Sequence, residues 1–422
     1  MKKWLVIIAV VALALIGLLF FVVPDELDIP GLKQHTVDLK KGLYQQSIKS
    51  LWFDYGDIAV YYHRSEWVKT WDFPYSFTNQ EYPPLGVLYF SIPRIFTSTE
   101  HGYIQAFVGF SAFTYVAFLF IMWKLLAALH RPRWYMIALF LPSFLYFIAS
   151  RFDIFAATIV MAAVWLLVKK KFVGSMVLLG VAMLIKWYPI LLIPFAIAWA
   201  SQQGISRKEI RKGVIWSASI FFGATGITLI MSGVRAGFPY GFHILRGVEM
   251  GSLPSVFLKI VSVFHVPIQS DAFIIVLGLI LFGIQLLPLF YGTFLYPRMQ
   301  HYVVSFDDFL RFSLLAVMIF VHAGKIYSPQ WEIWWLPLAA LVICKRSELF
   351  ILIAIDLLNY TIFPLIPVIY NAGWFRYAFF DSIVIVHAVF ILVLGMLISK
   401  PLFVRHQLQE VQGVRIGTPI IY

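Results

Sequence analysis

Apolar runs separated by short polar segments make up most of the 422-residue chain. A helix needs about 20 apolar residues to cross the hydrocarbon core of a bilayer. By this criterion the pattern predicts about twelve membrane helices, the shorter of which are expected to be tilted, kinked or re-entrant. The predicted spans are residues 4–23, 102–128, 135–150, 152–168, 172–185, 187–200, 213–232, 272–294, 308–323, 331–344, 348–367 and 380–399. The expected fold class is an all-α, polytopic integral membrane protein.

The first apolar run, residues 4–23, follows two lysines, as the core of a secretory signal peptide does. It is longer than an ordinary signal-peptide core and ends in Val-Val-Pro, without the small residues of a cleavage site. We therefore interpret this run as a signal anchor that keeps the N-terminus in the cytoplasm.

Two polar stretches, residues 24–83 and 233–271, are long enough to form structure of their own. Both are too long for simple turns and too aromatic for disordered linkers. We predict a single membrane domain over residues 1–422, in which these stretches are packed, functional external loops. Residues 400–422 are predicted to form a short cytoplasmic tail.

The composition excludes a soluble globular protein. Hydrophobic residues make up 61% of the chain and charged residues 13%, against about 25% charged residues in soluble domains. The net charge of +12 could suggest a nucleic-acid partner, but no basic face or binding motif accompanies it. The single cysteine, Cys344, excludes an internal disulfide.

Membrane topology accounts for the excess of basic residues. Threading the twelve predicted spans alternately places 19 basic and only five acidic residues on the cytoplasmic side. This asymmetry is the one expected from the positive-inside rule. The sequence therefore predicts a multi-pass protein of the cell membrane with both termini in the cytoplasm and both long loops outside.

The first long loop contains a carboxylate and an aromatic residue at helical spacing. If Asp57 opens a short helix, Tyr61 lies one turn further along the same face. A carboxylate can take a proton from an acceptor hydroxyl that attacks an anomeric carbon, while an aromatic ring covers the apolar face of the sugar. Alternatively, the acidic residues of this loop cap helices or form ion pairs with Arg64 and Lys69.

Four basic residues lie between the predicted helices on the external side, where positive charge is otherwise scarce. They are Arg151, Lys186, Arg246 and Lys325. Together they could hold an anionic lipid head group such as a phosphate. Each could instead snorkel or form an ion pair, as Arg151 could do with Asp153.

Polar and aromatic residues beside these positions are candidates for substrate binding. They are Tyr61, Glu81, Tyr82, Glu249, Gln330 and Trp331. No metal-binding or phosphate-loop motif occurs, so we expect no metal and no cofactor. Asp356, midway along a predicted span, is either a proton-coupling group of a transporter or a buried acid hydrogen-bonded to Tyr360.

Several short motifs resemble the GT-C glycosyltransferases, most closely glycosyltransferase family 87, the polyprenyl-phosphate-mannose-dependent alpha-mannosyltransferases. Asp57-Ile-Ala-Val-Tyr61 and Glu81-Tyr-Pro-Pro-Leu85 resemble the family's first external loop. Gly174–Pro194 resembles its glycine-rich helix ending in Lys-x-x-Pro, and Lys325–Pro337 resembles its Ser-Pro-Gln-aromatic segment. His243–Ser252 is similar to a loop that carries an arginine and a serine.

The resemblance implies a GT-C architecture and an inverting transferase that moves a sugar, mannose, from a polyprenyl monophosphate to a lipid or glycan acceptor on the external leaflet. The residue matching the family's catalytic base is Asp57, with Asp54 as the second candidate. Arg246 and Lys186, with Lys325 or Arg151, would hold the leaving phosphate, and no metal is implied. The alternatives are a transporter or flippase for a lipid-linked sugar, and a ligase or polymerase of lipid-linked glycans.

Overall fold

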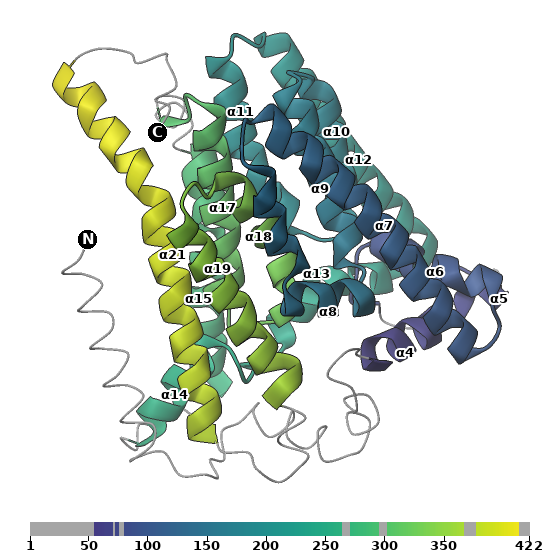
Figure 1. Ribbon diagram of the computed structural model, residues 1–422. Helices are drawn as coiled ribbons and strands as arrows, with labels where there is room; N and C mark the ends of the chain where they lie inside the picture. Colours follow the sequence, from purple (N-terminus) through teal and green to yellow (C-terminus); the bar gives the residue numbers. More distant parts are fainter. Residues whose placement is uncertain are drawn as a thin grey trace.

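A computed structural model of the chain describes residues 55–70, 72–75, 80–263, 271–294, 302–366 and 377–412, and this part of the chain is helical without a β-strand (Figure 1). Its principal helices are α4 (Tyr55–Arg64), α5 (Trp67–Thr70), α6 (Pro84–Phe96), α7 (Glu100–Ala128), α8 (Pro142–Ser150), α9 (Asp153–Val168), α10 (Phe172–Met183), α11 (Ile193–Gln202), α12 (Arg207–Ser232), α13 (Phe238–Leu245), α14 (Leu253–Val263), α15 (Asp271–Phe294), α17 (Phe306–His322), α18 (Glu332–Val342), α19 (Arg346–Tyr360) and α21 (Tyr377–Gln412). Short 3-10 or π segments join them: η1 (Arg133–Phe140), η2 (Tyr188–Leu192), η3 (Gly233–Gly237), η4 (Pro329–Trp331) and η5 (Thr361–Leu365).

Five of the described helices are long and apolar enough to cross a membrane, judged by length and composition. They cover Glu100–Ala128, Arg207–Gly241, Ile275–Thr293, Arg346–Leu365 and Ala378–Leu402. A sixth span is available if η1 and α8, which meet at 64°, cross as one bent unit. The expectation of a helical membrane protein agrees with these spans, but the number twelve is not confirmed.

Several of the predicted spans correspond to helices too short to cross a bilayer on their own. The 16-residue α9 rises about 24 Å, less than the roughly 30 Å of a bilayer core. Basic residues end it at Lys169, and prolines divide the neighbouring runs at Pro142 and Pro189. The predicted span 4–23 lies outside the described residues.

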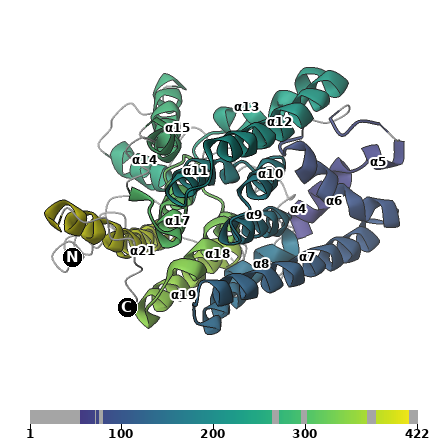
Figure 2. The same cartoon turned by 90° about the horizontal axis from the view of Figure 1, so that it is seen from above.

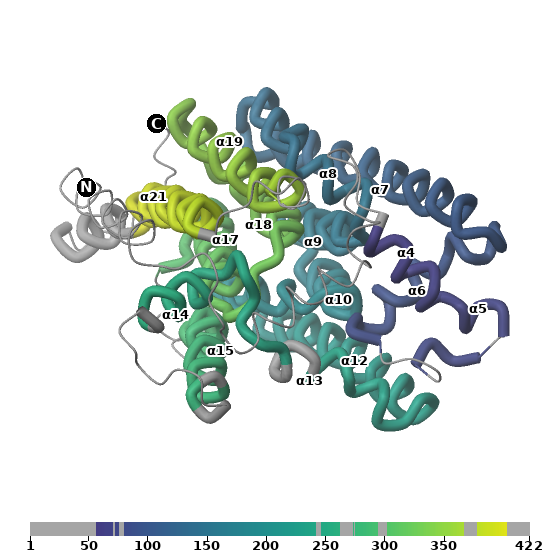
Figure 3. Tube along the Cα trace, turned by 90° about the horizontal axis from the view of Figure 1, so that it is seen from below, coloured from purple at the N-terminus to yellow at the C-terminus, as the bar shows by residue number. Residues whose placement is uncertain are grey.

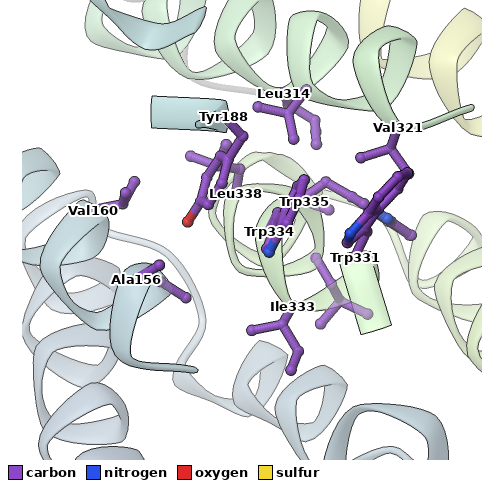
Figure 4. Close-up of a cluster of buried hydrophobic side chains, with 14 of the residues drawn as sticks. Ala156, Val160, Tyr188, Leu314, Val321, Trp331, Ile333, Trp334, Trp335 and Leu338 are labelled. Atoms are coloured by element: carbon purple, nitrogen blue, oxygen red, sulfur yellow. The ribbon is translucent and has the colours of Figure 1, made fainter. Parts of the chain in front are cut away.

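Helix α18 lies inside the bundle, and all eleven of its residues are buried. It packs against η1 and against α9 and α17, beside which it lies in Figure 2. Figure 4 shows its Trp334 and Trp335 among side chains from neighbouring elements, including Tyr188 and Leu314. Because helices in lipid associate mainly through close packing and hydrogen bonds, these large rings are expected to fix the position of α18.

Glycines let α10 and α12 approach closely. A Cβ atom at Gly180 would lie 2.8 Å from the carbonyl oxygen of Ser217, and one at Gly213 would lie 2.9 Å from the ring of Phe172. Small residues at such contacts are typical of membrane helices. The glycine-rich stretch therefore serves to pack α10, whose C-terminal end leads to Lys186.

An ion-pair cluster lies at the N-terminal end of α17. Asp307 accepts from Arg131 and from Arg311, each at 2.6 Å. Arg311 also donates to the carbonyl oxygen of Ile398 at 3.1 Å. The C-terminal end of α17 leads instead to Lys325, so the cluster and Lys325 lie at opposite ends of this helix.

Hydrogen bonds connect the segment that follows α4, which carries Asp57, to the end of α10. The backbone N–H groups of Leu85 and Gly86, in the first turn of α6, both donate to the carbonyl oxygen of Leu184, at 2.9 and 3.2 Å. Helix α4 lies against α6, α7 and α8 (Figure 3). These contacts place Asp57 beside the C-terminal end of α8.

Candidate functional site

Asp57 and Arg151 form an ion pair between α4 and the end of α8. Asp57 lies in the first turn of α4, and its Oδ2 is 2.9 Å from Arg151 Nη1. The side chain of Asp57 is 38% exposed, whereas that of Arg151 is 7% exposed. Arg151 Nε also donates to Oε1 of Gln330. The carboxylate is therefore accessible, and a buried guanidinium holds it from behind.

Lys186 and Asp153 form a second, buried pair. The two charged groups are 3.3 Å apart, and Trp334 Nε1 donates to Asp153 Oδ1 at 2.7 Å. The ammonium of Lys186 also lies over the rings of Tyr82 and Phe152, 4.8 and 4.3 Å from their centroids. Such faces attract cations. Lys186 is thus enclosed by one carboxylate and several rings.

These two ion pairs replace the Arg151–Asp153 pair that the sequence suggested as an alternative. Arg151 contacts Asp57, and Asp153 contacts Lys186. Arg151 is the C-cap of α8, and Asp153 lies in the first turn of α9. Because the chain turns between these two helices, Arg151 and Asp153 join different segments of the protein.

Tyr61 lies in an aromatic cluster. Its side chain is 1% exposed, and its ring stacks on that of Phe90 with 4.9 Å between centroids. Burial raises the pKa of Tyr61 well above its ordinary value. The helical spacing of Asp57 and Tyr61 is observed, but the ring supports α4 from inside and does not present an open face beside the carboxylate.

Glu81 and Tyr82 lie next to α4. Glu81 forms an ion pair with Arg64 at 2.5 Å, and the Arg64 guanidinium lies 5.8 Å from the centroid of the Tyr82 ring. Burial, with a smaller effect from Glu81, raises the pKa of the Tyr82 hydroxyl. Tyr82 therefore lies between two cations, Arg64 and Lys186.

The second loop brings two more basic residues together. Arg246 Nη2 lies 3.1 Å from Glu249 Oε1, and the Glu249 N–H donates to the carbonyl oxygen of Lys325 at 2.9 Å. Burial, and then the nearby positive charge of Arg246, lower the pKa of Lys325. Arg246 and Lys325 therefore lie close to each other, and guanidinium and ammonium groups are the donors that suit an anionic ligand.

A buried ion pair anchors the helix that follows this loop. Lys259 Nζ in α14 donates to both carboxylate oxygens of Asp381 in α21, at 2.7 and 2.9 Å. Ser252 Oγ, just before α14, donates to the carbonyl oxygen of Glu249 at 2.7 Å. The segment that carries Arg246 and Glu249 is thus connected through α14 to α21.

Trp331 continues inward from Gln330 as part of an aromatic stack. The rings of Trp331 and Trp334 lie 5.2 Å apart, and those of Trp334 and Tyr188 lie 4.9 Å apart (Figure 4). Trp331 is 9% exposed. The stack connects the turn carrying Gln330 to the buried Asp153–Lys186 pair, because Trp334 donates to Asp153.

Asp356 accepts hydrogen bonds from the protein backbone. Its oxygens accept from the N–H groups of Ser143 and Phe144 at 3.1 and 3.0 Å. The sequence offered Tyr360 as a partner, whereas the partners found are these two backbone groups. These contacts give Asp356 a role at the start of α8.

The remaining expectations concern residues and ligands not covered by these contacts. Asp54 lies outside the described residues. Among the described residues, no group of three or more His, Cys, Asp or Glu side chains could hold a metal ion. Sequence reasoning did not assign roles to Trp334 or Asn359, since a tryptophan or asparagine inside an apolar run has no recognisable motif.

Apolar spanning helices and a polar site at one end define a membrane-embedded protein, and comparison with known families shows that it is a glycosyltransferase. Residues 80–291 match the model of glycosyltransferase family 87. This match covers half of the chain, so the protein belongs to glycosyltransferase family 87, as the motifs indicated. It includes Arg151, Asp153, Lys186 and Arg246. No curated protein and no solved structure matches the chain.

Proposed function

We propose that the protein transfers a sugar, mannose, from a polyprenyl monophosphate to a hydroxyl group of a lipid or glycan acceptor, with inversion at the anomeric carbon. The observation that carries the proposal is the accessible Asp57 carboxylate, held 2.9 Å from a buried arginine at one end of the bundle. Family membership supports the reaction class.

Asp57 is proposed as the general base. Its carboxylate takes the proton of the acceptor hydroxyl while that oxygen forms a bond to the anomeric carbon. The bond between this carbon and the phosphate oxygen breaks, and the phosphate leaves with the bonding electrons. The positive charge of Arg151 favours the ionised form of Asp57, which is the form able to accept the proton.

Arg246 and Lys325 are proposed to hold the leaving phosphate. In an inverting displacement the attacking and leaving oxygens lie on opposite sides of the anomeric carbon, so the base and the phosphate ligands need separate positions. Arg151 is in direct contact with Asp57, and Lys186 is enclosed with Asp153. The loop cations, of which Arg246 is 33% exposed, better suit the phosphate.

The end of the bundle that carries Asp57 is proposed to face outward from the cell membrane, with both termini in the cytoplasm. The excess of basic residues at the other ends of the predicted spans supports this orientation. Nucleotide sugars are confined to the cytoplasm, so a lipid-linked sugar is the donor expected outside.

The proposed function is tested with purified protein in lipid nanodiscs. A panel of polyprenyl-phosphate sugars is supplied with a membrane extract as the source of acceptor, and release of free polyprenyl phosphate is measured. We expect release from the mannosyl donor, dependent on the acceptor fraction and lost in Asp57→Asn. A donor panel that gives no release above that of Asp57→Asn would contradict the proposal.

A further inference from the structure

Asn359 in α19 contacts both segments that hold Arg151, the ion-pair partner of Asp57. These segments are α8 and the turn that carries Gln330. Nδ2 of Asn359 lies 2.9 Å from Ser143 Oγ, at the start of α8, and 2.8 Å from the carbonyl oxygen of Pro329. It also lies 2.6 Å from Oε2 of Glu332. The Asn359 side chain is fully buried, so it is an internal connection between α8 and the turn at residues 328–332.

The amide oxygen of Asn359 and the nearby carboxylate of Asp356 also accept hydrogen bonds. Oδ1 of Asn359 accepts from the hydroxyl of Tyr327, just before the turn, at 2.6 Å, so the amide contacts two residues of the turn and the residue that precedes it. Asp356, one helical turn earlier and also fully buried, accepts from the first N–H groups of α8. Buried polar groups of this kind are costly to leave without partners, so both contacts strongly restrain α8 and the turn.

Both restrained segments meet again at Arg151. Helix α8 has nine residues, about 13 Å of rise, and Arg151 is its C-cap. The turn supplies Gln330, which accepts from Arg151 Nε. Arg151 in turn contacts Asp57 at 2.9 Å. The placement of Arg151 therefore depends on α8 at one end and on the Gln330 turn at the other.

We propose that Asn359, together with Asp356, is a positioning residue for the reaction, which sets the geometry of the Asp57–Arg151 pair by holding α8 and the Gln330 turn in register. This inference rests on the proposed function, in which Asp57 is the base. Neither residue touches substrate. Their effect passes through Gln330 and Arg151 to the carboxylate that accepts the proton.

The first test is a double-mutant cycle of turnover. Asn359→Leu removes the amide contacts at similar volume and is expected to lower kcat about 10- to 100-fold, as small misplacements of catalytic groups do, with the donor KM changed less than about twofold. In a Gln330→Ala protein the same substitution should cost less, because the connection to Arg151 through the turn is already broken and only the one through α8 remains. Independent, multiplicative losses would overturn the inference.

The second test measures the distance between α4 and α8 and does not depend on activity. Spin labels are placed at Val60 in α4 and Leu145 in α8, which are each 39% exposed, in a Cys344→Ser background. Asn359→Leu should broaden or shift the distance distribution between the labels. Gln203→Leu is the matched control, since the Gln203 amide donates only to the carbonyl oxygen of Val304 outside this network, at 3.2 Å. It should leave the distribution and kcat unchanged.

The outcomes separate this inference from the proposed function. If Asn359→Leu does not fold, Ser143→Ala removes the contact of Asn359 with α8 but keeps the contacts of Asp356 with the backbone of α8, and it should give a smaller change in the same direction. Full turnover of Asp57→Asn would contradict the proposed function. An inactive Asp57→Asn protein beside a fully active Asn359→Leu protein with an unchanged distance distribution would overturn only the role of Asn359.

Discussion

The ammonium of Lys186 and the carboxylate of Asp153 lie 3.3 Å apart, with side chains 9% and 0% exposed. Removing one member of such a pair leaves a buried charge without compensation, which typically costs about 3–5 kcal/mol. We therefore expect Lys186→Met and Asp153→Asn each to lower the free energy of unfolding by about this amount. Chemical denaturation in detergent would measure it.

The double variant and an exposed pair provide the controls for this prediction. Lys186→Met with Asp153→Asn should recover most of the loss, because no isolated charge remains. Arg64→Met breaks the pair with Glu81, whose side chains are 25% and 18% exposed, and should cost less than Lys186→Met because a charge nearer to solvent is better screened. Equal losses in Arg64→Met and Lys186→Met would show that burial of the Lys186–Asp153 pair has no special effect.

Arg246 is expected to contribute to donor binding. Loss of a charge-assisted contact costs roughly 1.5–3 kcal/mol, so Arg246→Ala should raise the donor KM about 10- to 100-fold without unfolding the protein. Kinetics at limiting donor, together with thermal unfolding, would check this. An Arg246→Ala protein with wild-type kinetics at limiting donor would remove Arg246 from the phosphate site.

Lys325 should make donor binding sensitive to alkaline pH. Burial and the charge of Arg246 lower the pKa of Lys325, so its positive charge is present at low pH and is lost as the pH rises, before an ordinary lysine would lose its proton. The donor KM should therefore increase with pH in this range. Lys325→Arg keeps its charge and should flatten the profile. The same rise in both proteins would contradict the assignment.

The orientation in the membrane can be measured by cysteine labelling. In a Cys344→Ser background, Glu66→Cys beside α4 should react with an impermeant maleimide in intact cells. Ser206→Cys, at the start of α12, should react only after permeabilisation. Both positions are exposed. Labelling of both cysteines from the same side would contradict the proposed topology.

The sequence predicted local features better than relationships between distant segments. The apolar runs of α7 and α12 are long and uninterrupted, so their helices were predictable. The runs at α9 and α10 are similarly apolar, but their helices have 16 and 12 residues, too few for a simple span. Hydrophobicity alone therefore does not determine how many times the chain crosses a membrane.

In the candidate site, too, single residues were predictable from the sequence but contacts between distant residues were not. Residue type and motif identified Asp57 and Arg151 separately, but no local pattern showed that they form a pair, because 94 positions separate them in the chain and folding brings them together. Adjacent residues suggested an Arg151–Asp153 pair instead. Asn359 was not recognised, since its importance comes only from its contacts with Ser143 and Pro329.

The central claim is that Asp57 accepts the proton of the acceptor hydroxyl, and the most direct measurement is turnover of Asp57→Asn beside its donor affinity and thermal stability. Asparagine keeps the size of the side chain but not its basicity, so turnover should fall at least about 100-fold, while donor affinity and stability remain nearly unchanged. Asp54→Asn, the matched control, should be much milder. An active, normally stable Asp57→Asn protein, or a greater loss in Asp54→Asn, would contradict the account.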